Sequence, residues 1–212
     1  MKKIATLLAA ALLLASTAHA QLQVGAGYLN STLTQASKEA SVTNGFYAGL
    51  SYNIPVVAGL GVAPGLYYSM LGGKNTGGVN FFGLASTSTE SKFSESAINL
   101  PVYLNYGIQM AKDFKFFVFA GPTVQYGLSS TTKSNTTVSV GSHEGGTNGT
   151  IDNYANDYGR LNVYMGGGAG MNAGRIQVNV GFDYGLLNLY TGSDANMSSY
   201  RYNIKLGVAF VF

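Results

Sequence analysis

Large apolar and aromatic side chains occupy every second position of the last thirteen residues, 200–212. They are Tyr200, Tyr202, Ile204, Leu206, Val208, Phe210 and Phe212. The intervening positions are mostly small or polar. A two-residue period indicates a β-strand with one apolar and one polar face. In an outer-membrane barrel the apolar face contacts lipid and the polar face lines the lumen, whereas a half-buried strand of a soluble sandwich is the alternative.

Seven further segments show the same alternation. They are residues 22–30, 46–54, 60–71, 93–108, 114–128, 160–171 and 175–187. Their opposite faces carry glycine, tyrosine and polar side chains, which suit a narrow hydrated bore better than a dry core, because buried polar groups need partners. Within the apolar bands the charged residues fall on the polar face. A lysine or arginine facing mid-bilayer costs about 2–4 kcal/mol, so this placement favours the lipid-exposed barrel.

The connections between these segments alternate in length. Residues 31–45, 72–92, 129–159 and 188–199 form long stretches rich in Ser, Thr, Asn and Gly, whereas 55–59, 109–113 and 172–174 are short. If the chain enters from the periplasm, every long loop is extracellular and every short turn is periplasmic, as in outer-membrane barrels. The sequence therefore predicts an all-β fold: an eight-stranded antiparallel up-and-down transmembrane β-barrel.

Aromatic residues near the segment ends predict two girdles at the membrane interfaces. The outer girdle would contain Tyr28, Phe46, Tyr68, Tyr126, Tyr184 and Tyr200, and the inner one Tyr52, Tyr106, Phe114, Phe210 and Phe212. Pro64, Pro101 and Pro122 lie within segments and cannot donate a ladder hydrogen bond. We expect bulges or bends at these three prolines.

The composition supports a lipid-exposed barrel. The chain has 212 residues with 29 Gly, 15 Tyr and 11 Phe, and only 10% of the residues are charged. A soluble domain carries about 25% charged residues, whereas a barrel that faces lipid has no large charged surface to cover. Cysteine is absent, so a closed, hydrogen-bonded barrel rather than disulfides would stabilise an exported chain.

Residues 1–20 have the pattern of a cleaved secretory signal peptide. A basic start at Lys2 and Lys3 is followed by an apolar run and by the small-residue motif Ala-His-Ala at 18–20. Residues 21–212 would then form one outer-membrane β-barrel domain. The formal net charge of +3 falls to +1 without the two lysines, so we expect no nucleic-acid partner.

Several stretches resemble a known family. They are Ala-Ile-Asn-Leu-Pro-Val-Tyr-Leu-Asn-Tyr at 97–106, Phe-Ala-Gly-Pro-Thr-Val-Gln-Tyr at 119–126, Tyr-Met-Gly-Gly-Gly-Ala-Gly at 164–170, Phe-Asp-Tyr-Gly-Leu-Leu-Asn at 182–188 and the terminal Phe212. Together they resemble the small outer-membrane β-barrel domain family common in Bacteroidetes, loosely called porin-like or PorT-like. The resemblance covers nearly all of 21–212 and implies an eight-stranded barrel, mostly of unassigned function.

The resemblance carries over no catalytic residues, and the PorT relatives are linked to protein secretion. The apolar face of the last segment, with Phe210 and Phe212, is expected to be the signal read by the barrel-assembly machinery, which the resemblance also implies.

No segment predicts an enzyme, a cofactor site or a metal site. His143 lies in a glycine-rich stretch with Ser142 and Glu144, where sequence neighbours cannot aim at one point without rigid support. A lipid-modifying enzyme is the alternative that this histidine leaves open. The run 166–170 lacks the Lys-Ser/Thr pair of a phosphate loop and is interpreted as a strand that passes close to bulky lumen side chains.

Six charged residues are candidates for a charge network in the lumen: Glu95, Lys115, Arg175, Asp183, Arg201 and Lys205. Asp183 and Lys205 lie on neighbouring predicted strands and both face inward. Because side chains nearly fill an eight-stranded barrel, we interpret the network as a plug, with a selectivity filter as the alternative.

We therefore expect a protein of the cell outer membrane, surrounded by its lipids, with a structural or surface-interaction role and a mostly plugged lumen. Loop 129–159, the longest, is the expected surface for a ligand or a protein partner. A small-solute porin-like channel and an accessory component of protein secretion are the alternatives.

Overall fold

The computed structural model describes residues 21–35, 38–81, 85–140, 143–192 and 197–212, so the proposed signal peptide lies outside it. The described residues form nine strands and one short 3-10 helix. They are β1 (Gln21–Gln35), β2 (Lys38–Val57), β3 (Leu60–Phe81), β4 (Ala85–Ala111), β5 (Phe114–Val140), β6 (His143–Asp152), η1 (Asn153–Ala155), β7 (Leu161–Ala173), β8 (Ile176–Gly185) and β9 (Ser199–Val211). In the described part of the chain, no helix is long and apolar enough to cross a membrane.

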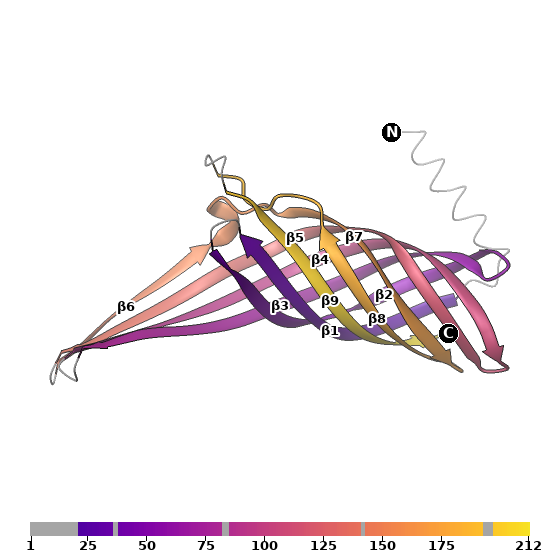
Figure 1. The fold of residues 1–212 in the computed structure, drawn as a ribbon, viewed down its shortest axis with the longest axis horizontal. Helices are drawn as coiled ribbons and strands as arrows, with labels where there is room; N and C mark the ends of the chain where they lie inside the picture. The colour runs from indigo at the N-terminus through magenta and orange to yellow at the C-terminus, as the bar shows by residue number, and fades with distance from the viewer. Residues whose placement is uncertain (1–20, 36–37, 82–84, 141–142, 193–196) are drawn as a thin grey trace.

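Eight of the strands form a closed antiparallel ring in the order β1, β2, β3, β4, β5, β7, β8 and β9 (Figure 1). β9 closes the ring against β1, with pairs that run from Gln23 and Val211 to Gln35 and Ser199. The prediction of an eight-stranded barrel is confirmed. The strand that closes it, β9, contains most of the alternating stretch 200–212.

Three of the four predicted long loops are wrong as loops, because the strands continue through them. β3 and β4 stay paired as far as Phe81 and Ala85, and β6 pairs with the outer half of β5. Residues 73–81, 85–94, 131–140 and 143–152 therefore form a four-stranded extension, here called the protruding sheet. It extends away from the barrel at the end opposite the C-terminus (Figure 1).

The protruding sheet has no apolar alternation because most side chains on both of its faces are polar, with Val79, Val138 and Ile151 as exposed exceptions. Its strands are held by backbone pairing and by hydroxyl contacts across strands, such as Thr89 with Thr136 and Ser91 with Ser134, each at 3.2 Å. Threonine favours strands, and cross-strand hydroxyl pairs stabilise them, yet neither leaves an alternation of hydrophobicity. Only the connection before β9 lacks a described strand, apart from an isolated bridge between Tyr158 and Tyr190.

The short connections are tight turns, as predicted, and they share the end at which the chain terminates. At the β2–β3 turn, Ala58 and Gly59 have φ angles of 37° and 85°, in the left-handed region that glycine adopts most readily. At the β7–β8 turn, Gly174 has a φ of 58°. The barrel thus has one end with short turns and one end with the protruding sheet.

The apolar side chains face outward and the polar ones inward, which confirms the predicted orientation. On β9, Leu206 and Val208 are 52% and 56% exposed, whereas Arg201 and Asn203 are 3% and 4% exposed. This is the reverse of a soluble core, and it suits a barrel whose outer surface contacts lipid.

The expected bulges at the three prolines are absent. The register is the same on both sides of each proline, but the ladder lacks the pairs that would join Pro64 to Tyr52, Pro101 to Gly65 and Pro122 to Val102. The described register shifts lie elsewhere, for example between Pro55 and Val57. A proline without a backbone N–H therefore interrupts the ladder locally without displacing the strands.

The orientation of the strands can be tested with adjacent residues of β8. Val180 faces outward and is 49% exposed, whereas Asn179 lines the interior. Val180→Arg is expected to lose about 2–4 kcal/mol of folding free energy in a bilayer, because the charge faces hydrocarbon. Asn179→Arg is expected to fold nearly as well as the parent. Urea titration of the gel-shift between folded and unfolded forms in lipid vesicles measures both, and equal losses would contradict the assigned faces.

Candidate functional site

A buried ion pair crosses the barrel from wall to wall. Arg201 in β9 donates two hydrogen bonds to the Glu95 carboxylate in β4, at 2.5 and 2.9 Å. β4 and β9 are four strands apart in either direction around the ring, so the two residues come from opposite walls. Both side chains are 3% exposed or less. A two-pronged pair of this kind is directional as well as strong, so it ties the two walls together.

Two stacked tyrosines cover the outer side of this ion pair. Arg201 also donates a hydrogen bond to the Tyr158 hydroxyl at 2.6 Å, and the Tyr158 ring stacks on Tyr154 with centroids 5.8 Å apart. The Arg160 guanidinium lies 4.6 Å from the centre of the Tyr154 ring. These residues belong to the segment between β6 and β7, which therefore folds over the end of the barrel that carries the protruding sheet.

The local sequence explains how this segment is held. The Asp152 carboxylate accepts a hydrogen bond from the Tyr154 backbone N–H at 3.0 Å and so caps η1. Burial raises the pKa of the Tyr154 and Tyr158 hydroxyls, so both phenols remain neutral at physiological pH. The neutral Tyr158 hydroxyl accepts a hydrogen bond from Arg201, and Glu95 remains the group that balances the positive charge of the arginine.

A second ionic contact lies deeper in the barrel. The Lys205 ammonium is 2.6 Å from the Asp183 carboxylate on the neighbouring strand and donates a hydrogen bond to the Tyr103 hydroxyl at 2.8 Å. Tyr103 is on β4, so Lys205 repeats the connection between the opposite walls. A wall network runs alongside, in which Tyr164 donates to Gln125 at 2.9 Å and Gln125 to Asn99 at 2.9 Å.

Below the ion pair the lumen is hollow. A cavity of about 140 Å³ is lined by polar and aromatic side chains, among them Tyr47, Asn105, Lys115, Phe119 and Lys205. Glu95, Arg201 and Tyr158 do not line it, because the cavity ends beneath them. The ion pair and Tyr158 thus cross the lumen on the side of the protruding sheet, and the cavity lies on the side of the short turns.

The glycine run of β7 leaves room for the aromatic side chains that narrow this cavity. A Cβ on Gly168 would lie 2.6 Å from the ring of Phe119, and one on Gly170 would lie 2.4 Å from the ring of Phe117. The run is part of a strand that passes close to bulky lumen side chains, as interpreted from the sequence.

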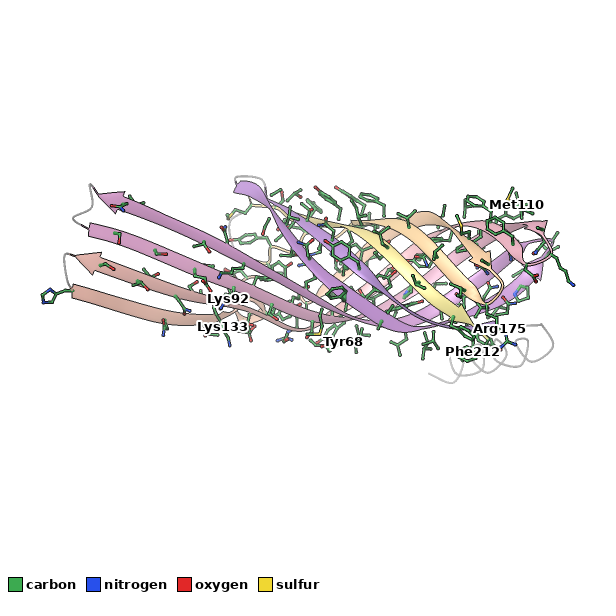
Figure 2. All side chains as sticks on the ribbon, turned by 90° about the horizontal axis from the view of Figure 1, so that it is seen from below. Tyr68, Lys92, Met110, Lys133, Arg175 and Phe212 are labelled. Atoms are coloured by element: carbon green, nitrogen blue, oxygen red, sulfur yellow. The ribbon has the colours of Figure 1, made fainter. Side chains whose placement is uncertain are left out.

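The structure brings together four of the six charged residues predicted for the lumen: Glu95 with Arg201, and Asp183 with Lys205. Lys115 is half-buried and lines the cavity without a described ion pair. Arg175 is not part of the network, because it lies at the β7–β8 turn, before β8 begins, and is exposed. Figure 2 shows it near Phe212, at the end of the barrel opposite the protruding sheet.

Sequence reasoning missed the tyrosines that contact the charges. Tyr103 lies on the lumen face of its predicted strand, so its position was available, but its contact with Lys205 requires the opposite wall. Tyr154 and Tyr158 fall in a stretch without periodicity, and no local signal indicates that it folds back over the lumen.

The remaining candidates lie far from this network. His143 begins β6 at the tip of the protruding sheet, opposite Val140, and is exposed. Among the described residues no three His, Cys, Asp or Glu side chains gather as a metal site would require. The Phe210 and Phe212 rings face outward on the closing strand with centroids 4.9 Å apart, and their role as an assembly signal stays a prediction.

Because the Glu95–Arg201 pair is buried, the losses of folding free energy in its single and double variants are expected to be non-additive. Glu95→Gln or Arg201→Met alone is expected to lose about 3–5 kcal/mol of folding free energy, because each leaves the other charge buried and unpaired. The double variant is expected to recover most of that loss. Urea titration in lipid vesicles measures the cycle, with Glu90→Gln, which removes a half-buried ion pair on the protruding sheet, as a control expected to change little. Additive single losses would contradict the coupling.

A family model described as outer membrane protein beta-barrel domain matches residues 15–191. No curated protein matches the chain. Among solved structures, Ail, the attachment invasion locus protein of Yersinia pestis, is 12% identical with a TM-score of 0.41 and covers 91% of this chain and 98% of its own. Neisserial surface protein A is 14% identical with a TM-score of 0.42, over 90% and 97% of the two chains. Ail in complex with the heparin analogue sucrose octasulfate is 11% identical with a TM-score of 0.45, over 91% and 99%.

Proposed function

The chain belongs to the outer membrane protein beta-barrel domain family, and we propose that this outer-membrane protein acts as a surface-interaction module with a lumen closed to the cell exterior. The observation that carries the proposal is the Glu95–Arg201–Tyr158 arrangement beneath the protruding sheet. This arrangement closes the bore, and the protruding sheet outside it offers a large polar surface to a partner.

The protruding sheet is the proposed interaction surface. It lies at the end opposite the short turns, which in outer-membrane barrels are periplasmic, so it would extend from the cell. It takes the place of the expected loop 129–159, most of which belongs to β5, β6 and η1. A paired sheet presents its side chains in fixed positions, whereas a long loop would first have to be ordered on binding.

The closed lumen argues against free diffusion of solutes. A solute would have to separate Arg201 from both Glu95 and Tyr158, which would leave two charges in a confined space without partners. The cavity below favours a second candidate, a small-solute channel that opens when this ion pair separates. Non-enzymatic action is part of the proposal, since the exposed His143 lies at the tip of a sheet, remote from any other described ionisable cluster.

Two finer assignments stay predictions. They are membership in the Bacteroidetes type of the family and an accessory role in protein secretion. Both rest on the sequence resemblance, and no described feature of the barrel favours the secretion role.

Conductance in planar bilayers tests the closed lumen. The parent protein is expected to give no steady channels, because the ion pair and the stacked tyrosines block the bore. A Glu95→Ala/Arg201→Ala variant is expected to conduct, since both side chains that cross the bore are shortened together and no unpaired charge remains. Asn179→Ala, which leaves the ion pair intact, is the matched control. Steady open channels from the parent protein would overturn the closed lumen and favour the channel.

A further inference from the structure

We infer that the protruding sheet carries a binding site for the phosphate groups on the sugar headgroups of outer-leaflet glycolipids around the barrel. The site is a row of three lysines: Lys74 in β3, Lys92 in β4 and Lys133 in β5. The strand register places Lys74 opposite Lys92, and Lys92 opposite Lys133. Side chains directly opposite in antiparallel strands share a face, with Cβ atoms about 4.5–5.5 Å apart. Figure 2 shows Lys92 and Lys133 side by side on one surface of the sheet.

The row carries more positive charge than its neighbours neutralise. Among the described residues, Glu90 is the one carboxylate in contact with it, at 2.7 Å from Lys74 and 2.9 Å from Lys92. Hydrogen bonds from these two lysines lower the pKa of Glu90, so this carboxylate stays charged. Lys133 is exposed and has no ion pair among the described residues. Three lysines therefore face one carboxylate.

The next acidic residue along this face is already engaged. The strand register places Asp152 opposite Thr131, two residues from Lys133. Its carboxylate caps η1 and is therefore held by the Tyr154 backbone N–H. Like charges placed directly opposite destabilise a sheet, so the row gains stability when a multivalent anion lies across it.

The row faces the same way as the lipid-contacting side chains below it. On β3, Lys74 follows Tyr68 and Met70 on one face, and these two side chains are 45% and 54% exposed. On β4, Lys92 lies on the same face as Leu100, which is 48% exposed. The lysines thus face sideways over the membrane surface and not along the barrel axis.

The height of the row matches a sugar layer better than the hydrocarbon boundary. Lys74 is six residues beyond Tyr68, a member of the predicted outer aromatic girdle, and six strand residues span about 20 Å. With strands tilted by about 35–45°, the row lies roughly 15 Å above the girdle. Phospholipid headgroups end below that level, because the headgroup layer of one leaflet is only about 5–8 Å thick. Phosphorylated sugars of a glycolipid reach it.

The lateral orientation favours a lipid-borne anion over a soluble one. A neighbouring glycolipid meets the side of the protruding sheet, where the row is, whereas a ligand from solution meets its tip first. The row also lies where the pairing of β3 with β4 and of β4 with β5 is continuous, so the backbones of its three lysines are held side by side for an anion that spans them.

Binding of lipopolysaccharide to the protein in phosphatidylcholine nanodiscs tests the site. The probes are lipopolysaccharide with a phosphorylated core, the same molecule with its core phosphates removed, lipid A alone and soluble heparin. The phosphorylated-core form is expected to bind best, and removal of the core phosphates is expected to abolish the preference. Lipid A binding equal to the phosphorylated core would overturn the assigned height, and heparin binding of equal strength would overturn the lipid source.

Four variants identify the residues. Lys92→Gln/Lys133→Gln is expected to weaken binding of the phosphorylated core about twenty-five-fold, at about fivefold per lysine near an anionic surface. Glu90→Gln is expected to strengthen it about fivefold, because the row gains net charge and a folding defect cannot raise affinity. Lys112→Gln, in the exposed β4–β5 turn, is the matched control and should change nothing, as should Arg175→Gln at the β7–β8 turn. Unchanged binding in the double lysine variant would overturn the site.

Stability to urea in the absence of glycolipid gives a second readout. Without glycolipid, Lys133→Gln, which leaves both contacts of Glu90 intact, is expected to be at least as stable to urea as the parent, because repulsion between Lys92 and Lys133 is relieved. A loss of stability without glycolipid would contradict the unbalanced row. The site rests on the outer-membrane location and is independent of the closed lumen, so binding and conductance fail or succeed separately.

Discussion

Pairing of the backbone is the constraint on which the whole structure depends. No water is present in the hydrocarbon of a bilayer to satisfy an unpaired N–H or C=O, so a set of spanning strands must close on itself. Here β9 closes the ring against β1, and the pairing continues to the last residues, where the Phe212 N–H donates to the Leu22 carbonyl at 2.9 Å. Once the ring is closed, one face of every strand contacts lipid and the other must be packed inside a narrow tube.

The interior follows from that division. Because apolar side chains are needed outside, the tube is filled by polar and charged ones, and each buried charge then needs a partner. Neighbouring strands supply one such partner, Asp183 for Lys205, and the opposite wall supplies the other, Glu95 for Arg201. Contacts across the diameter hold opposite walls of the barrel together. The ion pair and the tyrosine above it lie across the outer part of the lumen, while the inner part keeps a cavity lined by polar and aromatic side chains.

Contact with lipid decides which parts of the fold the sequence predicts. Alternation of apolar side chains identifies all eight barrel strands and their lipid faces, because hydrocarbon contact imposes it on each strand independently. It also predicts the inward positions of Glu95, Asp183, Arg201 and Lys205. It does not identify β6 or the outer halves of β3, β4 and β5, whose two faces both contact water and so carry no period in hydrophobicity.

Contacts between distant segments are the other part that sequence reasoning cannot reach. The partner of Arg201 depends on which strands lie across the ring, and Tyr158 reaches it from a segment without periodicity. Arg175 was predicted for the lumen because it continues the alternation of β8 by one residue, yet it belongs to the β7–β8 turn and is exposed. End residues of a strand are assigned least reliably by any periodic pattern, since the pattern does not mark where pairing stops.

The central proposal is that the lumen is closed to the exterior and reached from the periplasm, and cysteine accessibility tests it most directly. The chain has no cysteine, so Asn179→Cys introduces a single thiol that lines the cavity below the Glu95–Arg201 pair. A small, charged, membrane-impermeant thiol reagent is predicted to leave this cysteine unmodified in intact cells and to modify it once the periplasmic side is exposed. Val138→Cys in the exposed protruding sheet should react in both cases. Equal modification of Asn179→Cys in intact and opened cells would contradict the closed lumen.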